Sequence, residues 1–186
     1  MTVLSRAAVA GALALACSSA FAFQLSSPDI GPKVPIGNKF VFKGFGCEGE
    51  NVSPALAWKA PPAGTKSFAL LVHDPDAPTG GAGWWHWVVY NLPAGTAALS
   101  QGAGSADGGK LPAGAVQQKT DFGAAGWGGP CPPAGDKPHR YVFTVYALKV
   151  DKLEIPDGAS ASLVGFMVNA NAIGKATLVG KYGRKK

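Results

Sequence analysis

Short apolar runs separated by turn residues recur along the chain, and they predict a protein built mainly from β-strands. Three runs rich in β-branched or aromatic residues are the strongest candidates: Phe68–His73, Trp84–Leu92 and Tyr141–Leu148. Shorter runs predict four more strands: Lys39–Lys43, Leu56–Lys59, Ala115–Gln118 and Ala176–Val179. Many short strands between Gly- and Pro-containing turns favour an antiparallel sandwich or barrel.

One segment, residues 159–173, breaks this pattern because it lacks proline and repeats its apolar residues at helical spacing. The residues on one face of such a helix are Leu163, Phe166, Met167, Ala170 and Ile173. We predict one helix packed on the sheets through this face. Asp157 or Ser160 is expected to cap its start, and Gly174 to end it.

The composition supports a compact fold. Among 186 residues there are 26 Gly and 15 Pro, too many for a long helical bundle. Hydrophobic residues make up 47% and charged residues 15%, which argues against global disorder. We find no internal repeat and no linker, so residues 23–186 are predicted to form one domain.

The first 22 residues are typical of an export signal. Arg6 precedes the apolar run Ala7–Ala16, which is too short to span a bilayer. Small residues at positions 20 and 22 predict cleavage before Phe23. A lipoprotein anchored through Cys17 is the rival interpretation, disfavoured by the bulky Leu15. No later stretch is expected to cross a membrane, so we predict a soluble periplasmic or secreted protein.

Cleavage at this site leaves two cysteines, Cys47 and Cys131. An even number of cysteines in an oxidising compartment predicts a disulfide, and two buried free thiols are the alternative.

The basic charge is concentrated at the C-terminus. Of the formal net charge of +6, Arg6 leaves with the leader and four basic residues lie in the tail, residues 181–186, so the body is near +1. A nucleic-acid binder needs a basic face on the fold itself. We therefore predict no nucleic-acid partner and interpret the tail as a frayed, solubilising terminus.

The three histidines, His73, His86 and His139, all adjoin unusual loops. Strand alternation places His86 on one face with Trp84 and Val88, and His139 with Tyr141. A single histidine in an aromatic strand is more often structural than functional. Rigid Pro-containing loops beside strand-end imidazoles nevertheless favour a preorganised small-ligand pocket. The strand-poor stretches 102–114 and 121–137 are expected to be functional or mobile loops.

Three kinds of chemistry remain open for these residues. A hydrolase would need Cys131 as nucleophile with a histidine base, which a disulfide would prevent; no Gly-x-Ser-x-Gly motif occurs either. A metal site would draw on a loose set of residues without a recognised spacing: His73, Asp74, Asp76, His86 and His139. An anion site would use imidazolium, backbone N–H groups and the Tyr141 hydroxyl as donors.

Four ordered motifs carry a family resemblance: Asp74–Pro78 (DPDAP), Trp84–Asn91 (WWHWVVYN), Gly129–Pro133 (GPCPP) and His139–Tyr141 (HRY). Together with Asn51–Pro54 and Leu163–Asn171, they resemble the phosphatidylethanolamine-binding protein family, in its bacterial Raf-kinase-inhibitor-like (YbhB/YbcL) branch. The resemblance implies a β-sandwich of two antiparallel sheets with a pocket at one end for phosphate-like anions or phosphoethanolamine head groups. The implied walls are Asp74, Pro78, Trp84, His86, Pro132, Pro133, His139 and Tyr141. It also implies a supporting salt bridge between Asp76 and Arg140.

The resemblance leaves two interpretations of Asp74 beside an anion site. Asp74 either receives the ammonium of a zwitterionic head group, or orients a histidine and favours its charged form. In both cases anion binding is expected to weaken as pH rises through the histidine pKa. The family's eukaryotic members carry a C-terminal lid helix, for which residues 181–186 are too short and polar.

We expect an exported, non-enzymatic binding protein that uses no cofactor or metal and takes a small anion or phospholipid head group. The alternative is an inhibitor or modulator of a protein partner, such as a protease, a kinase-like protein or a host factor. In that case the loops at the rim of the pocket would form the contact surface.

Overall fold

The computed structural model describes residues 22–186, so the predicted signal peptide lies almost entirely outside the described part. The strands are β1 Gln24–Ser26, β2 Lys43–Gly44, β3 Cys47–Glu48, β4 Leu56–Lys59, β5 Ser67–Asp74, β6 Trp84–Pro93, β7 Ala98–Leu99, β8 Val116–Gln117, β9 His139–Leu148 and β10 Ala172–Tyr182. The helices are α1, Ala161–Asn171, and the short 3₁₀ helix Asn38–Phe40. Neither described helix is long and apolar enough to cross a membrane.

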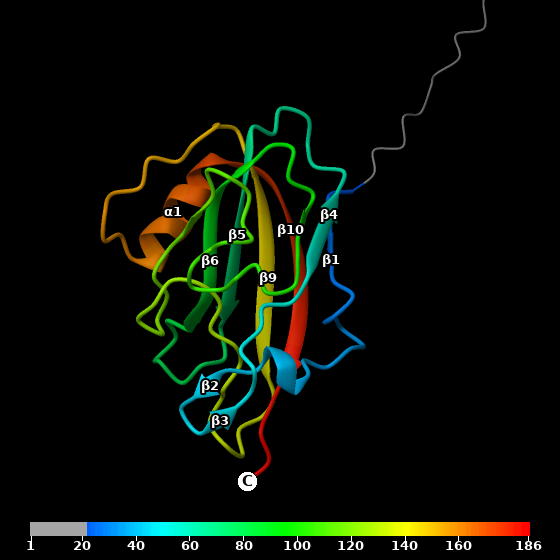
Figure 1. Ribbon diagram of the computed structural model, residues 1–186, viewed down its shortest axis with the longest axis vertical. Coiled ribbons are helices and arrows are strands. Elements are labelled where there is room, and N and C mark those ends of the chain that lie inside the picture. Colours follow the sequence, from blue (N-terminus) through cyan, green and yellow to red (C-terminus); the bar gives the residue numbers. More distant parts are fainter. Residues whose placement is uncertain (1–21) are drawn as a thin grey trace, which may run out of the picture.

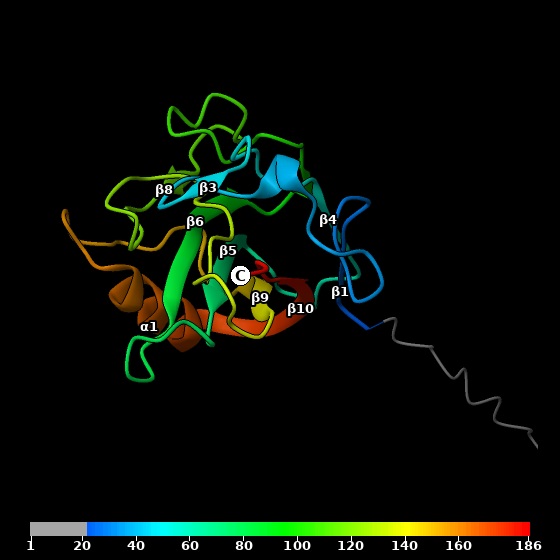
Figure 2. The same ribbon diagram turned by 90° about the horizontal axis from the view of Figure 1, so that it is seen from below.

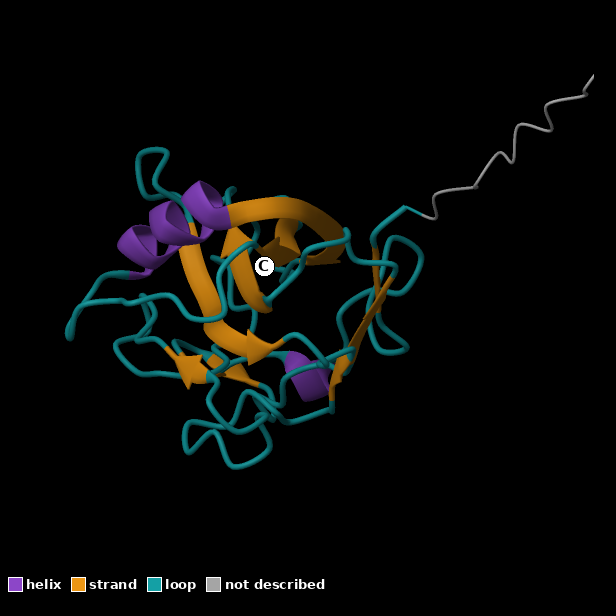
Figure 3. Ribbon diagram, turned by 90° about the horizontal axis from the view of Figure 1, so that it is seen from above, coloured by secondary structure: helices purple, strands orange, loops and turns teal. Residues whose placement is uncertain are grey.

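Two antiparallel sheets face each other, as predicted. The larger sheet has the strand order β10-β9-β5-β6-β8, and the smaller has the order β1-β4-β7. Helix α1 covers the outer face of the larger sheet, while β1 and β4 lie on its other side (Figures 1 and 3). A separate two-stranded hairpin, β2–β3, lies at the lower end in Figure 1, near the C-terminus. The mainly β fold with one C-terminal-region helix is therefore confirmed.

Strand β5 shows why the larger sheet needs cover on both faces. Phe68, Leu70 and Val72 pack in the core between the sheets, whereas Ala69 and Leu71 pack in a second cluster beneath α1. All five side chains are buried, which accounts for the continuous apolar run in the sequence. Burial of each large apolar side chain contributes about 1.5–3 kcal/mol, so both layers stabilise this central strand.

The three long predicted strands are confirmed, as are the short strands Leu56–Lys59 and, with fewer residues, Ala115–Gln118. The strand prediction for residues 39–43 is wrong: Asn38–Phe40 form a 3₁₀ turn, in which the N–H of Val41 donates to the carbonyl oxygen of Asn38 (3.1 Å). Phe40 and Val41 are both buried although they are adjacent, which a regular strand with one covered face does not allow. Strand β10 is much longer than predicted because its pairing with β9 continues through polar residues.

Helix α1 forms where predicted, but it buries the opposite face. The hydroxyl oxygen of Ser160 accepts a hydrogen bond from the N–H of Leu163 (3.1 Å), so the predicted cap is confirmed. The buried residues are Ala161, Val164, Gly165 and Val168. The predicted core face is wrong: Phe166 is 68% exposed and Leu163 39%. Close approach to the sheet favours the small and β-branched residues. Gly174 does not end the helix but lies within β10.

A β-bulge in β6 changes the predicted placement of His86. Val72 pairs with Trp87 and His73 with Trp85, so His86 is the extra residue. Trp85 consequently packs on the α1 side and Trp87 in the core between the sheets, although they are two residues apart. The prediction that His86 and Val88 share one face of the strand is therefore wrong, because His86 is the bulged residue. His86 faces the pocket, and Val88 packs beneath α1.

The prediction of a frayed C-terminal tail is wrong, because the tail is held against the fold. Lys181 and Tyr182 still belong to β10. Arg184 donates from Nε to the carbonyl oxygen of Pro132 (2.7 Å) and from a terminal guanidinium nitrogen to that of Gly46 (2.9 Å). These contacts attach the chain end to the hairpin and to the loop before β9. Figure 2 shows the C-terminus at the centre of this end of the molecule.

Candidate functional site

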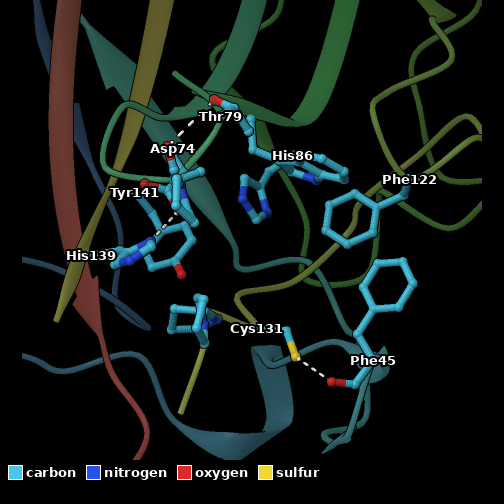
Figure 4. Close-up of a pocket in the computed structure, with 13 residues that line it drawn as sticks. Phe45, Asp74, Thr79, His86, Phe122, Cys131, His139 and Tyr141 are labelled. Atoms are coloured by element: carbon cyan, nitrogen blue, oxygen red, sulfur yellow. Dashed lines mark hydrogen bonds and ion pairs between the residues drawn. The ribbon is translucent and has the colours of Figure 1, made fainter. Parts of the chain in front are cut away.

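A cavity of about 210 Å³ lies at the end of the larger sheet where β5 stops and where β6 and β9 begin. All eight predicted wall residues line it: Asp74, Pro78, Trp84, His86, Pro132, Pro133, His139 and Tyr141. The antiparallel pairing of β5 with β6 and β9 brings their motifs to one edge, although they are far apart in the sequence. Figure 4 shows the side chains around this space. Their role in binding stays a prediction.

Asp74 is buried and holds His139 in place. Its Oδ2 accepts from Nδ1 of His139 (2.7 Å), and its Oδ1 accepts from the N–H of Asp76 (2.8 Å). Nε2 of His139 lies 3.6 Å from Oδ2 of Asp136. Both oxygens of Asp74 therefore already have a donor, which supports orientation of a histidine over direct contact with a ligand ammonium.

His86 is also buried, and its tautomer follows from its partner. Its Nδ1 lies 2.5 Å from the carbonyl oxygen of Gly128, which can only accept, so Nδ1 carries a proton. Burial lowers the pKa of His86 to about 4, against the opposing effects of Gly128 and the Asp74 carboxylate. Neutral His86 consequently keeps Nε2 as a hydrogen-bond acceptor. Among the predicted anion donors, an imidazolium at His86 is therefore disfavoured near neutral pH.

Tyr141 contributes a hydroxyl without a partner. This oxygen is buried and makes no hydrogen bond among residues 22–186. The rings of Tyr141 and His86 are perpendicular, with centroids 5.0 Å apart, so their polar atoms serve the same small space. Burial raises the pKa of Tyr141, which keeps the hydroxyl protonated and able to donate. A buried polar group left unsatisfied is unusual and points to a missing partner.

The outer part of the cavity is apolar, a feature that the sequence reasoning missed. Phe45, 69% exposed, lies at the tip of the β2–β3 hairpin and stacks on Phe122 with centroids 6.0 Å apart. Phe122 also contacts Trp84 and His86 edge-on. We call Phe45, Phe122 and Trp84 the aromatic rim. Its sequence signal was available, because Phe45 stands alone between two glycines and Phe122 stands alone in a polar loop.

The Pro-containing loop of the cavity is held from three sides. The Asn51 side chain donates to the carbonyl oxygen of Trp127 (3.0 Å) and accepts from the N–H of Gly129 (2.8 Å). The Gly128 N–H donates to the backbone oxygen of His86 (2.8 Å). The predicted disulfide is confirmed: Cys47 and Cys131 are bonded, with their Cα atoms 6.0 Å apart. Cys131 in this state is no nucleophile, and the bond ties the hairpin to the cavity wall.

The predicted salt bridge between Asp76 and Arg140 is also present, outside the lining of this cavity. Arg140 donates from Nε to Oδ2 of Asp76 (2.9 Å) and from a terminal nitrogen to Oδ1 (2.6 Å). This bidentate pair lowers the pKa of Asp76 to about 2. The pair fixes the loop after β5 against the start of β9, and so holds one wall of the cavity.

The residues considered for a metal site do not all come together in the structure. His73 packs against Trp85 on the α1 side of the sheet, with ring centroids 4.4 Å apart, and is no part of the cavity lining. Within the described part of the chain, no group of three or more His, Cys, Asp or Glu side chains is placed to hold a metal ion.

Comparison with known proteins agrees with this geometry. The family model described as phosphatidylethanolamine-binding protein matches residues 30–183. The Escherichia coli protein YbcL is 53% identical over 165 residues, which cover 89% of this chain and 90% of that protein. E. coli YbhB is 48% identical over 161 residues, covering 86% and 99%.

A solved structure extends the similarity to the fold. The crystal structure of E. coli YbcL, described as a member of the mammalian PEBP family, superimposes with a TM-score of 0.85. The alignment covers 88% of this chain and 99% of the YbcL chain. With the sandwich, the four motifs and the cavity in place, this chain belongs to the phosphatidylethanolamine-binding protein family.

Proposed function

We propose that this chain is an exported binding protein without enzymatic activity, and that its cavity takes a small phosphate-type anion such as a phosphoethanolamine head group. The observation that carries the proposal is the buried, unpartnered hydroxyl of Tyr141 beside His86. A phosphoryl oxygen accepts hydrogen bonds strongly, and so supplies the partner that this hydroxyl lacks. The family's printed name supports a phospholipid head group as the class of ligand.

Calorimetric titration of the purified protein with phosphoethanolamine and inorganic phosphate tests this proposal. We expect saturable binding to one site, with about tenfold lower affinity in Tyr141→Phe, because one charge-assisted hydrogen bond is lost. Tyr146→Phe is the matched control, since Tyr146 lies on β9 away from the cavity lining. If neither ligand binds the wild-type protein, the proposed function is wrong.

Export is a separate part of the proposal. It is supported by the leader-like residues 1–22 and by the Cys47–Cys131 bond, since disulfides persist mainly in oxidising compartments. Intact mass measurement of the protein from periplasmic and cytoplasmic fractions is the test. We expect a periplasmic or secreted species that begins at Phe23 and is lighter than the reduced chain by about two hydrogens. A full-length cytoplasmic species would contradict it.

The second candidate function is modulation of a protein partner through the aromatic rim. The observation that favours it is Phe45, a large apolar side chain that is 69% exposed beside the cavity. A photo-crosslinking residue at position 45 in living cells would trap such a partner. For this function we expect one defined adduct. Excess wild-type protein should displace it, whereas excess Phe45→Ser protein should not. No adduct would contradict it.

A further inference from the structure

The polar atoms in the cavity form a donor and acceptor pair, not a set of donors. Tyr141 Oη carries a proton and has no partner in the described chain. His86 donates from Nδ1 to Gly128, so its neutral ring offers only a lone pair at Nε2. No hydrogen bond to this nitrogen occurs within residues 22–186, and the ring lines the cavity. A matching ligand must therefore bring both an acceptor and a proton.

The charges around this pair also restrict the ligand. Of the titratable groups, Asp74 from β5 and His139 and Tyr141 from β9 line the cavity with His86. Around them, Asp136 lies beside His139, Asp121 accepts from the N–H of Trp85, and His73, on the α1 side of the sheet, acts on His86 through its charge alone. The Asp74 carboxylate is buried at the cavity wall. A second negative charge on a bound phosphate would be repelled by Asp74, and its desolvation would be costly.

We propose that the cavity selects the singly protonated form of a phosphate monoester, whose P–OH donates to Nε2 of His86 while another phosphoryl oxygen accepts from Tyr141. The proposal rests on the proposed function, since it concerns the same cavity. The P–OH is favoured over a ligand ammonium as the donor. A carboxylate is the strongest partner for an ammonium, and each oxygen of Asp74 already accepts one hydrogen bond, from His139 and from Asp76.

This selection predicts a pH dependence that originates in the ligand. A phosphate monoester loses its second proton with a pKa near 6. If only the monoanion binds, affinity for ethyl phosphate falls roughly 25-fold between pH 5.5 and 7.5. Ethyl sulfate has nearly the same shape and one negative charge, but no proton to donate over this range. Its affinity is expected to be lower and nearly constant.

Titration calorimetry with these two esters at both pH values separates the possible causes. A similar rise in ethyl sulfate affinity at pH 5.5 would locate the titrating group in the protein and not in the ligand, and would overturn the proposal. Equal affinity for the two esters at both pH values would overturn it while leaving the proposed function intact. Failure of both esters and of phosphoethanolamine to bind would overturn both.

Three further measurements make the result specific. The ³¹P resonance of bound ethyl phosphate at pH 7.5 is expected at the monoanion position, and a dianion position would overturn the proposal. His86→Leu removes the acceptor and is expected to abolish the preference for phosphate over sulfate. If this variant unfolds, the wild-type ester comparison and the ³¹P position still decide the question. Phosphoethanolamine binding no tighter than that of its sulfate analogue would show that the P–OH is not needed as a donor, and would also overturn the proposal.

Discussion

At the scale of single residues, Tyr141 is where binding and stability are expected to oppose each other. Its hydroxyl is buried and unpartnered without ligand, a state that costs about 1–3 kcal/mol. We therefore predict that Tyr141→Phe leaves the melting temperature of the free protein unchanged or raises it, although it weakens phosphate binding. Differential scanning calorimetry without phosphate is the measurement. A clear fall in melting temperature would mean that the hydroxyl has a structural partner.

The Asp76–Arg140 pair predicts a stability effect confined to acid. The pKa of Asp76 is lowered from 3.8 to about 2, so the pair stabilises the fold above pH 4 and this contribution is lost as pH falls from about 4 to 2. In Arg140→Gln we expect only a small fall in the free energy of unfolding at pH 5, since the Arg140 side chain is 54% exposed and solvent screens the pair.

Urea denaturation at pH 5 and pH 2.5 checks this prediction. The difference between wild type and Arg140→Gln should shrink at the lower pH. Lys66→Gln is the control, because Lys66 pairs with Asp151 at 3.5 Å while both side chains are largely exposed. A loss in Arg140→Gln that is equal at both pH values would show that the pair contributes through packing and not through charge.

At the scale of elements, helix α1 has apolar residues on two faces, of which one is buried and the other is exposed. Val168 is fully buried against the larger sheet, and Phe166 is 68% exposed. Val168→Ala should lower the free energy of unfolding by about 2 kcal/mol through lost burial and a small cavity. Phe166→Ala should change it by no more than about 0.5 kcal/mol. Equilibrium urea unfolding of both variants is the measurement, and a larger loss in Phe166→Ala would restore the face expected from the sequence.

This helix shows where sequence reasoning stops. The cap and the extent of the helix follow from local chemistry: Ser160 was one of two predicted caps, and the helix bounds lie within two residues of the predicted segment. The buried face was not, because Leu163 and Phe166, three residues apart, and Val164 and Val168, four apart, both fit one face of a helix. The choice depends on how closely α1 approaches the sheet. At Gly165 the helix lies in contact with Trp85: a Cβ added there would be 3.5 Å from the Trp85 ring, an ordinary van der Waals distance.

The cavity shows the same division. Its walls lie in four compact motifs at strand ends and in the adjoining Pro-containing loops, and the family resemblance of these motifs predicted all eight. The disulfide was also predicted. The roles of the histidines were not predictable. Whether His86 donates or accepts depends on the β-bulge and on the Gly128 carbonyl, a contact between residues 42 positions apart. The aromatic rim likewise forms only when the hairpin and the loop after β8 come together.

At the scale of the whole molecule, the chain end closes the cavity region. Arg184 donates to Pro132 and to Gly46, the second of which is 138 positions earlier, and so joins the loop before β9 to the hairpin that carries Phe45. The carbonyl oxygen of Arg184 also accepts from the N–H of Gly135 (3.1 Å). The Cys47–Cys131 bond links the same two segments. The cavity is thus bounded by segments from the beginning, middle and end of the fold.

We predict that Arg184→Met lowers phosphate affinity by about three- to tenfold with only a small fall in melting temperature. Two hydrogen bonds from a charged group are lost, and the disulfide still holds the hairpin near the loop. Lys185→Met is the matched control, since Lys185 is exposed and loses the same charge. Titration calorimetry gives the affinity, and amide hydrogen exchange across residues 44–47 should become faster only in Arg184→Met. Equal effects of the two variants would contradict this prediction. Lys185 does not make the Arg184 contacts, so an equal loss would show that the tail acts through its net charge.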